Sequence, residues 1–343
     1  MSTIFMAIIL LVLSIAPVIA LGAIIYKFDF DKEPTLTLIK LFICGICSTF
    51  LTLTVTWGLS LFIPFFSADI SSLNLIELIP AIFIGVGLIE EFSKWIFVYA
   101  LEYNDREFNH LYDGIVYATF VSLGFACLEN ILYVFQSGIG TAIMRAFISI
   151  PGHLCFGVMM GYYLSLAKLA FINKNKKLSK RNLILSILIP TLAHGLFDYL
   201  IYASTIVDSD FLSMGFTFLF YAFIIAYFIY CSRKVVQFSK NKYNLNPGYV
   251  KSYPQRPINY GYYNNSYPQY PINNNTYNNS YPQPMSNSYY NNSYSQPINN
   301  GYNNNPQQLV NNNIETIVKS KYCMNCGTKV VGKFCPNCGN KIM

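Results

Sequence analysis

Long apolar segments dominate the first two thirds of this chain, and each is long enough to cross a lipid bilayer as a helix. One crossing takes about 20 consecutive apolar residues, and two of the segments, 36–66 and 141–170, are longer than that and leave room for an eighth short element. We therefore expect an all-α polytopic membrane protein with seven or eight transmembrane helices, and the pattern argues against a soluble globular enzyme. The seven segments are 4–26, 36–66, 73–101, 111–135, 141–170, 183–202 and 211–231.

Charge divides the chain near residue 232. The whole chain has 23 basic and 16 acidic side chains, for a formal net charge of +7. Residues 1–232 contain 12 of the basic and 15 of the acidic side chains, whereas residues 233–343 contain 11 basic side chains and one acid, Glu315. The positive charge therefore belongs to the C-terminal third, and it gives little support to a nucleic-acid partner.

Lysine and arginine collect in alternate connections between the apolar segments. Basic residues lie in the first and third connections, in the fifth between Lys174 and Arg181, and after the last segment, whereas the second and sixth have none. The positive-inside rule then places the N-terminus outside and the C-terminus in the cytoplasm of a multi-pass cell-membrane protein. Because the first segment has no basic n-region and no A-x-A site, we expect it to be a retained helix.

The composition changes after the last apolar segment. Residues 233–319 are rich in Asn, Tyr, Pro, Gln and Ser between about 244 and 313, with Ser-Tyr-Pro-Gln repeated from Ser252, Ser266 and Ser280. So polar and proline-rich a sequence has too little apolar surface to fold, and it predicts a disordered tether. The chain thus divides into a membrane domain (1–232), a tether (233–319) and a terminal module (320–343).

The terminal module carries two Cys-x-x-Cys-Gly motifs. Eight residues separate the two cysteine pairs, and this spacing suits a tetrahedral site with four thiolate ligands. A reducing cytoplasm would keep the thiols free to bind metal, so we predict a structural zinc ribbon. The terminal module shows no aromatic platform and no base-reading helix. We therefore expect it to dock a cytoplasmic protein rather than to bind nucleic acid. The four predicted zinc ligands are Cys323, Cys326, Cys335 and Cys338.

Ionisable residues within the apolar segments are the most informative residues of the chain, because each costs about 2.5–3.5 kcal/mol at mid-bilayer. The third segment contains Glu90, Glu91 and Lys94. Glu90 and Lys94 are i,i+4 neighbours and can pair, while Glu91 points about 100° away. One acid is then left to bind a proton, a metal or another helix. We expect a general base with a tuned pKa here, and the alternative is a structural ion pair.

Two further segments bring polar residues into the membrane. Phe125, Glu129 and Tyr133 share one helical face in the fourth segment, where an inter-helix hydrogen bond is an equal alternative to a functional role. In the fifth segment His153 precedes Gly157 and Gly161, which form a small-x3-small face for close helix packing. An isolated histidine is ordinarily a core residue, but the chain has only three.

The sixth segment places His194 and Asp198 on one face, where the acid can fix the imidazole tautomer or share a ligand role. Counted along their helices, Glu90 and His194 both lie roughly 16 Å from the cytoplasmic side, and His153 and Glu129 lie about 10 Å nearer the outside. Helix tilt would have to close that gap for the residues to form one site.

These residues, taken in order, resemble the PrsW-type intramembrane proteases, which are related to the type II CAAX prenyl endopeptidases. The resemblance spans about residues 1–232, and one departure is Leu128, where the family often has Phe. We expect that change to affect packing more than chemistry. The motifs that carry the resemblance are Glu90-Glu91-x-x-Lys94, Glu129-x3-Tyr133, His153 followed by Phe156, and His194-x3-Asp198.

The resemblance implies an endopeptidase that cleaves a peptide bond within or beside the bilayer. A Glu of the first motif would activate water with His153, while His194 and Asp198 would stabilise the oxyanion. We favour Glu90 as the base and Glu91 as its helper. In an alternative mechanism, the two histidines and a Glu hold a metal that activates the water. The absence of H-E-x-x-H disfavours a conventional zincin.

The remaining residues of these motifs, Lys94, Glu129 and Tyr133, would have supporting roles. For this family the expected substrates are single-span membrane proteins such as anti-sigma-factor-like regulators. Two other functions remain open from the sequence: a proton- or metal-coupled transporter that uses the same residues as a relay, and a non-catalytic membrane scaffold whose ribbon recruits a partner. The lack of a visible internal helix repeat argues against the transporter.

Overall fold

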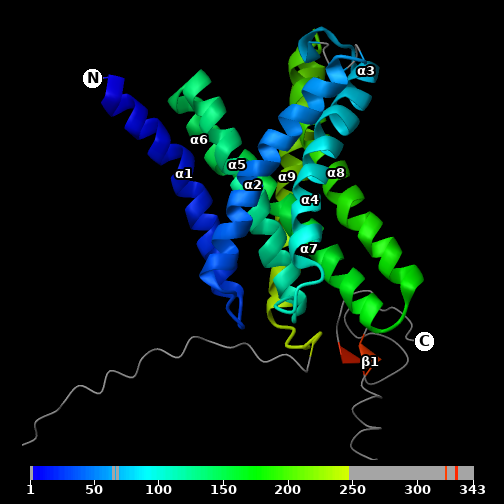
Figure 1. Ribbon diagram of the computed structural model, residues 1–343. Coiled ribbons are helices and arrows are strands. Elements are labelled where there is room, and N and C mark those ends of the chain that lie inside the picture. The colour runs from blue at the N-terminus through cyan, green and yellow to red at the C-terminus, as the bar shows by residue number, and fades with distance from the viewer. Residues whose placement is uncertain (1–2, 64–65, 67–68, 247–320, 323–328, 331–343) are drawn as a thin grey trace, which may run out of the picture. The chain divides into compact units, whose positions relative to one another are not determined.

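The computed structural model describes residues 3–63, 66, 69–246, 321–322 and 329–330 (Figure 1). Within these ranges the fold is helical except for two very short strands, which confirms the expected class. The long helices are α1 (Thr3–Phe28), α2 (Thr35–Ser60), α5 (Leu111–Ser137), α7 (Ser149–Ile172), α8 (Lys176–Ile206) and α9 (Asp210–Ser239). The shorter elements are the 3₁₀ turn η2 (Ile70–Ser72), α3 (Leu75–Pro80), the π-helix η3 (Ala81–Leu88), α4 (Ile89–Glu102) and α6 (Ile139–Phe147).

Six helical stretches in the described part of the chain are long and apolar enough to cross a membrane. The expected span 73–101 is present as a helical run, but it is divided into α3, η3 and α4. The expected span 141–170 is divided at Ile148 into α6 and α7. A multi-pass helical protein is therefore confirmed, with six or seven candidate crossings. The six stretches are Ile4–Phe28, Thr35–Ser60, Leu111–Ser137, Ile139–Ile172, Lys176–Ile206 and Asp210–Ser239.

Helices α5 and α7 pack against each other and are buried along most of their length. Gly114 of α5 faces Gly161 of α7 so closely that a Cβ atom on Gly161 would overlap the Gly114 backbone. One turn away, a Cβ atom on Gly157 would lie 3.0 Å from a backbone carbonyl oxygen of α5. The predicted small-residue face is thus confirmed. It holds together the two helices that carry Glu129 and His153.

The π-helix η3 packs against α8 through two glycines. A Cβ atom on Gly87 would lie 3.1 Å from the carbonyl oxygen of Thr191, and one on Gly195 would lie 2.7 Å from Cγ of Phe83. Because neither glycine has a side chain, η3 can approach α8 closely at this level. The start of α4, which follows η3 directly, is thereby brought next to the middle of α8.

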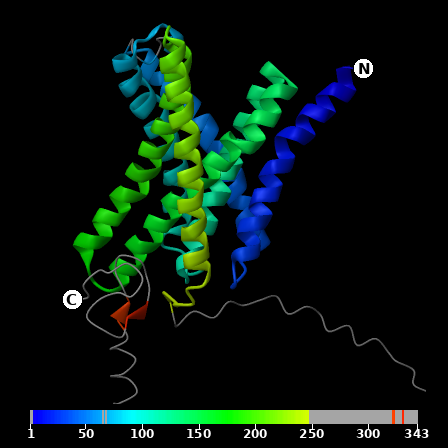
Figure 2. The ribbon, with the colours of Figure 1, turned by 180° about the vertical axis from the view of Figure 1, so that it is seen from behind.

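The remaining helices surround this centre. Helix α6 packs against α1, α5 and α7, and α9 packs against α7 and α8. Figure 1 shows α1 and α6 side by side, and Figure 2 shows α9 passing across the opposite face of the bundle. Helix α6 therefore packs against an outer helix and both central ones, and Ala142 is its one fully buried residue.

The chain beyond α9 is held at its start. The backbone amide of Leu245 donates to the carbonyl oxygen of Asn109 over 2.5 Å, and Asn244 forms an isolated β-bridge with His110. The Leu245 side chain is buried. The beginning of the predicted tether is therefore fixed against the connection between α4 and α5, and its residues 247–319 lie outside the described ranges.

A short hairpin is described near the C-terminus. Strand β1 (Lys321–Tyr322) pairs antiparallel with β2 (Lys329–Val330), so the hairpin brackets the first Cys-x-x-Cys-Gly motif. The four predicted zinc ligands lie outside the described residues: Cys323, Cys326, Cys335 and Cys338.

Candidate active site

The first two turns of α4 carry the two adjacent acids and the lysine. The Lys94 ammonium is completely buried and lies 2.8 Å from Glu91 Oε1 and 3.4 Å from Glu90 Oε2. The predicted pairing of Glu90 with Lys94 is present, but Glu91, expected about 100° away from that pair, lies closer to the ammonium as its i,i+3 partner. Glu91 is completely buried, whereas 12% of the Glu90 side chain is exposed. The two acids thus have different access to solvent.

Helices α5 and α7 supply the second part of the site. His153 Nε2 lies 2.9 Å from Glu129 Oε2, and His153 Nδ1 lies 3.2 Å from the Lys94 ammonium. An ammonium can only donate, so Nδ1 accepts from Lys94 and the imidazole hydrogen resides on Nε2, where it is donated to Glu129. The His153 carbonyl oxygen accepts a hydrogen bond of 2.6 Å from Ser122 Oγ, which fixes this part of α7 against α5.

Helix α8 supplies the third part. His194 Nδ1 lies 2.9 Å from Glu91 Oε1, while Nε2 lies 3.3 Å from Asp198 Oδ2 and 3.9 Å from Glu90 Oε2. The predicted pairing of His194 with Asp198 is present. The ring of Phe156 stacks on the His194 imidazole at 4.7 Å and 17°, which limits its rotation.

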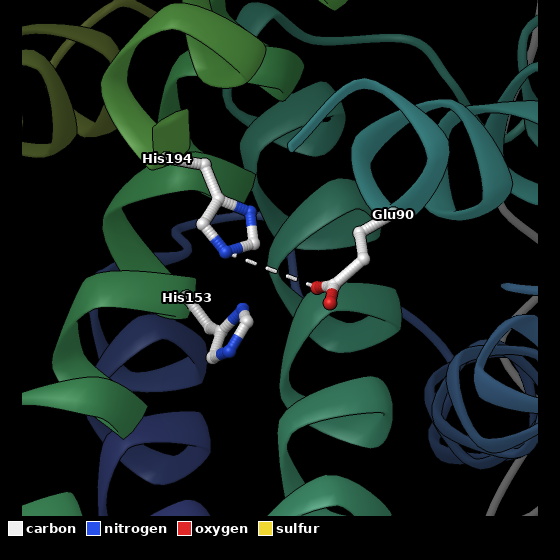
Figure 3. A group of neighbouring side chains, drawn as sticks. All are labelled: Glu90, His153 and His194. Atoms are coloured by element: carbon white, nitrogen blue, oxygen red, sulfur yellow. Dashed lines mark ion pairs between the residues drawn. The ribbon is translucent and has the colours of Figure 1, made fainter. Parts of the chain in front are cut away.

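The two histidines come together although the count along the helices put them at different depths. Their ring centroids are 5.3 Å apart. Figure 3 shows the imidazoles of His153 and His194 facing the Glu90 carboxylate, with the contact from His194 to Glu90 dashed. The gap of about 10 Å that was expected along parallel helices is therefore closed. Each residue of the predicted constellation in 1–232 contacts at least one other member, or lines the same cavity.

A cavity of about 650 Å³ opens on one side of this cluster. Glu90, Glu129, His153, His194 and Asp198 line it, whereas Glu91 and Lys94 do not. The rest of the wall is mainly apolar and aromatic, with side chains from α2, η3, α5, α6, α8 and α9. The site therefore has a sealed side behind the cluster and an accessible side in front of it.

One residue of the cavity wall was missed by the sequence analysis. Arg145 of α6 places Nη2 2.7 Å from Glu129 Oε2 and Nε 3.0 Å from Asn130 Oδ1. Its guanidinium carbon lies 4.4 Å from the centroid of the Tyr133 ring, a cation–π contact that gives this predicted supporting residue a definite partner. The signal was an arginine inside an apolar segment, which needs a partner for the same reason as the buried acids.

Three of these side chains fit a metal ion. Ligand atoms of Glu90, His153 and His194 all lie within 4.8 Å of one another. Two imidazoles and one carboxylate form a donor set typical of catalytic zinc. The Lys94 ammonium contacts both Glu90 and His153 Nδ1, so a metal ion bound through Nδ1 would take the place of that contact.

The surroundings of the two imidazoles support the same assignment. Metal-bound histidines usually donate their second ring N–H to a carboxylate or a carbonyl oxygen. Here each imidazole has one nitrogen against a carboxylate outside the group of three: His194 Nδ1 against Glu91, and His153 Nε2 against Glu129. The other nitrogens have partners of their own: His153 Nδ1 lies against Lys94, and His194 Nε2 lies near Asp198 and Glu90.

Comparison with known proteins places this site in a family. Residues 33–229 match the family described as PrsW family intramembrane metalloprotease. Protease PrsW of Oceanobacillus iheyensis is 37% identical over 187 residues, which cover 54% of this chain and 80% of the relative. Protease PrsW of Clostridioides difficile is 36% identical over 197 residues (56% and 79%), and that of Bacillus subtilis 33% over 198 residues (55% and 81%). No solved structure matches the chain.

The fold is that of a multi-pass membrane protein with carboxylate and imidazole groups gathered between its helices, and the family match makes it a membrane peptidase. The matched region contains the whole cluster from Glu90 to Asp198. The chain belongs to the PrsW family of intramembrane metalloproteases.

Proposed function

We propose that this chain is an intramembrane endopeptidase in which Glu90, His153 and His194 hold a divalent metal ion. The observation that carries the proposal is the convergence of their ligand atoms within 4.8 Å at the wall of the cavity. When bound, such an ion supplies Lewis-acid chemistry and makes water a better nucleophile. Glu91 is completely buried and does not line the cavity, which supports Glu90 as the acid that faces the substrate.

The surrounding carboxylates have separate tasks in this proposal. Glu91 accepts the Nδ1 hydrogen of His194, and Glu129 accepts the Nε2 hydrogen of His153, so each holds an imidazole in one orientation. Asp198 is the cavity-lining carboxylate that remains beside the cluster. We assign it the proton from the attacking water, which it then passes to the amine that leaves when the peptide bond breaks.

The substrate we propose is a membrane protein with a single span, of the anti-sigma-factor-like class that the family resemblance suggested. A cavity with a mainly apolar wall and one polar end suits an unwound segment of such a chain, whose peptide groups need polar partners inside the bilayer. We also propose the orientation given by the lysine and arginine bias, with the N-terminus outside and the C-terminal tail in the cytoplasm.

The tail is assigned a zinc ribbon on a tether. Strands β1 and β2 flank the first Cys-x-x-Cys-Gly motif in the sequence, and their antiparallel pairing supports this assignment because it closes the chain on both sides of the motif. We propose that the ribbon docks a cytoplasmic protein. A C-terminal tag that is accessible only from outside the cell would overturn both the orientation and the cytoplasmic role.

The catalytic assignment is tested with the full chain reconstituted in liposomes with candidate single-span substrates. The four ribbon cysteines are replaced by serine, so that chelation acts on the membrane site alone. We expect cleavage that is lost on chelation and restored by a divalent metal, and no cleavage with Glu90→Gln, His153→Ala or His194→Ala. The same fragments from the parent chain and these variants would overturn the assignment.

The other readings of the sequence predict different results in the same experiment. Full activity after chelation would favour Glu90 as a general base without a metal. Absence of cleavage by a folded chain across a broad substrate panel would favour the scaffold. Metal-dependent proton flux without cleavage would favour the transporter.

A further inference from the structure

Arg145 is joined to the site by a short series of contacts. Its Nη2 contacts the same Glu129 oxygen, Oε2, that accepts from His153 Nε2, at 2.7 Å and 2.9 Å respectively. Glu129 is thus held between a guanidinium on one side and an imidazole on the other. Charge-assisted hydrogen bonds of this kind are about twice as strong as neutral ones, so Arg145 fixes the position of the carboxylate.

Arg145 is itself held in place by its neighbours. Its Nε donates to Asn130 Oδ1, and Asn130 Nδ2 donates over 2.9 Å to the carbonyl oxygen of Ser14 on α1. The Tyr133 ring lies under the guanidinium. Only 15% of the Arg145 side chain is exposed. The guanidinium is therefore anchored from α1 and α5, and its direction toward Glu129 is set by more than one contact.

The parallel with the other imidazole shows what Arg145 does. His194 is oriented by Glu91, and Glu91 is held by the Lys94 ammonium. His153 is oriented by Glu129, and Glu129 is held by Arg145. Each histidine thus has its own carboxylate, and each carboxylate has its own cation. The second cation comes from a helix outside the motifs that identify the family in the sequence.

We propose that Arg145 is a positioning residue for His153, acting through Glu129 to hold the imidazole with its Nε2 hydrogen on that carboxylate and its Nδ1 directed into the cluster. The effect of Arg145 on metal binding rests on the proposed function, whereas its effect on the orientation of the imidazole does not. Without Arg145, the carboxylate can turn toward water in the cavity, and of its two hydrogen-bonding contacts the ring keeps only the one from the Lys94 ammonium to Nδ1.

The first test observes the imidazoles in the metal-free protein. The chain contains three histidines, so labelling them with ¹⁵N gives one pair of ring signals each. We expect the His153 ring of the full chain to show the Nε2–H tautomer. In Arg145→Gln the His153 Nε2 signal should shift because its hydrogen bond to Glu129 weakens, while Nδ1 keeps its contact with Lys94 and the His110 signals stay unchanged. Arg106→Gln, on the exposed connection after α4, is the matched control.

The second test measures binding of Co²⁺ by its absorption spectrum, in the full chain with serine at the four ribbon cysteine positions. We expect Arg145→Gln to weaken Co²⁺ binding about 10-fold, the lower end of the usual effect of residues behind a metal ligand. Arg145→Lys keeps the charge and should recover part of the loss. In a Glu129→Gln background, Arg145→Gln should have no further effect, because its route to His153 is already removed.

The outcomes separate the inference from the function on which it draws. If the parent chain binds no Co²⁺ but the His153 signals respond to Arg145→Gln, the metal assignment fails and the positioning role stands. If Arg145→Gln leaves both the His153 signals and the Co²⁺ affinity unchanged, the positioning role is wrong. Should Arg145→Gln fail to fold, Arg145→Lys and Glu129→Gln provide the same comparison. If the spectra of both variants are identical to those of the parent chain, the inference is overturned.

Discussion

The two histidines of the site are built alike but stand in different surroundings. His194 contacts Glu91, which is completely buried and paired with a completely buried lysine. His153 contacts Glu129, which lines the cavity with 18% of its side chain exposed and is paired with Arg145. Both imidazoles line the cavity, but the Glu91–Lys94 pair behind His194 is sealed from water, whereas the Glu129–Arg145 pair behind His153 opens onto the cavity. We call these pairs the sealed half and the open half of the site. This difference indicates that the sealed half contributes more to stability and the open half more to adjustment during turnover.

Removal of charge from the sealed half should have the largest effect. In Glu91→Gln the buried Lys94 ammonium keeps only the more distant Glu90 as a carboxylate on its own helix. Breaking a buried ion pair by removing one partner costs about 3–5 kcal/mol. We expect a loss of this size in the free energy of unfolding, together with loss of peptidase activity. Thermal and denaturant unfolding in bicelles measure it.

The matched control for this substitution is Asp208→Asn, an acid-to-amide change on the exposed connection between α8 and α9. It should change the unfolding free energy by less than about 0.5 kcal/mol. Equal stability of Glu91→Gln and Asp208→Asn would show that the sealed half carries no special energetic weight.

The equivalent change in the open half should cost less stability. In Glu129→Gln the released Arg145 guanidinium faces the cavity, where water can solvate it. We expect a loss of about 1–2 kcal/mol in unfolding free energy and a fall of about 10–100-fold in cleavage rate. For Glu91→Gln and Glu129→Gln, the fall in cleavage rate divided by the loss of unfolding free energy compares the two halves directly. A stability loss larger than that of Glu91→Gln would reverse the distinction.

A change at the edge of the open half should have the smallest effect. Tyr133→Phe keeps the ring on which the Arg145 guanidinium rests. We expect stability within about 0.5 kcal/mol of the parent chain. Tyr133→Leu removes the aromatic face and should cost about 0.5–1 kcal/mol more. If both variants behave alike in unfolding experiments, the ring contact does not help to hold Arg145.

Much of this arrangement was predictable from the sequence because intramembrane charges are rare and spaced by helical turns. Positions i and i+4 on a helix predicted three features of the site. Glu129 and Tyr133 share a face, His194 pairs with Asp198, and Gly157 allows close helix packing. The helical, multi-pass class followed from the length of the apolar segments.

The rest depended on distances between helices, which local spacing does not contain. Depth counted along separate helices gives a distance only if the helices are parallel and end in the same plane, so the approach of His153 to His194 was not predictable. The contact of Glu91 with Lys94 is an exception, because it is an i,i+3 pair on one helix that local spacing already allows. Arg145 depended on how the short helix α6 packs against α5, and its 16-residue separation from Glu129 shows no helical period.

The π-helical segment η3 determines which acid faces which partner. A π turn contains more residues than an α turn. The π-helix η3 therefore rotates α4 about the helix axis, relative to α3, to a different angle from the one that an α-helix of the same number of residues would give. Deletion of one residue within 81–88 would change the length of the run only slightly but would turn the adjacent acids about the helix axis, by somewhat less than the roughly 100° per residue of an α-helix. The identity of the exposed and the sealed carboxylate is thus encoded in a stretch of eight residues that contains no ionisable group.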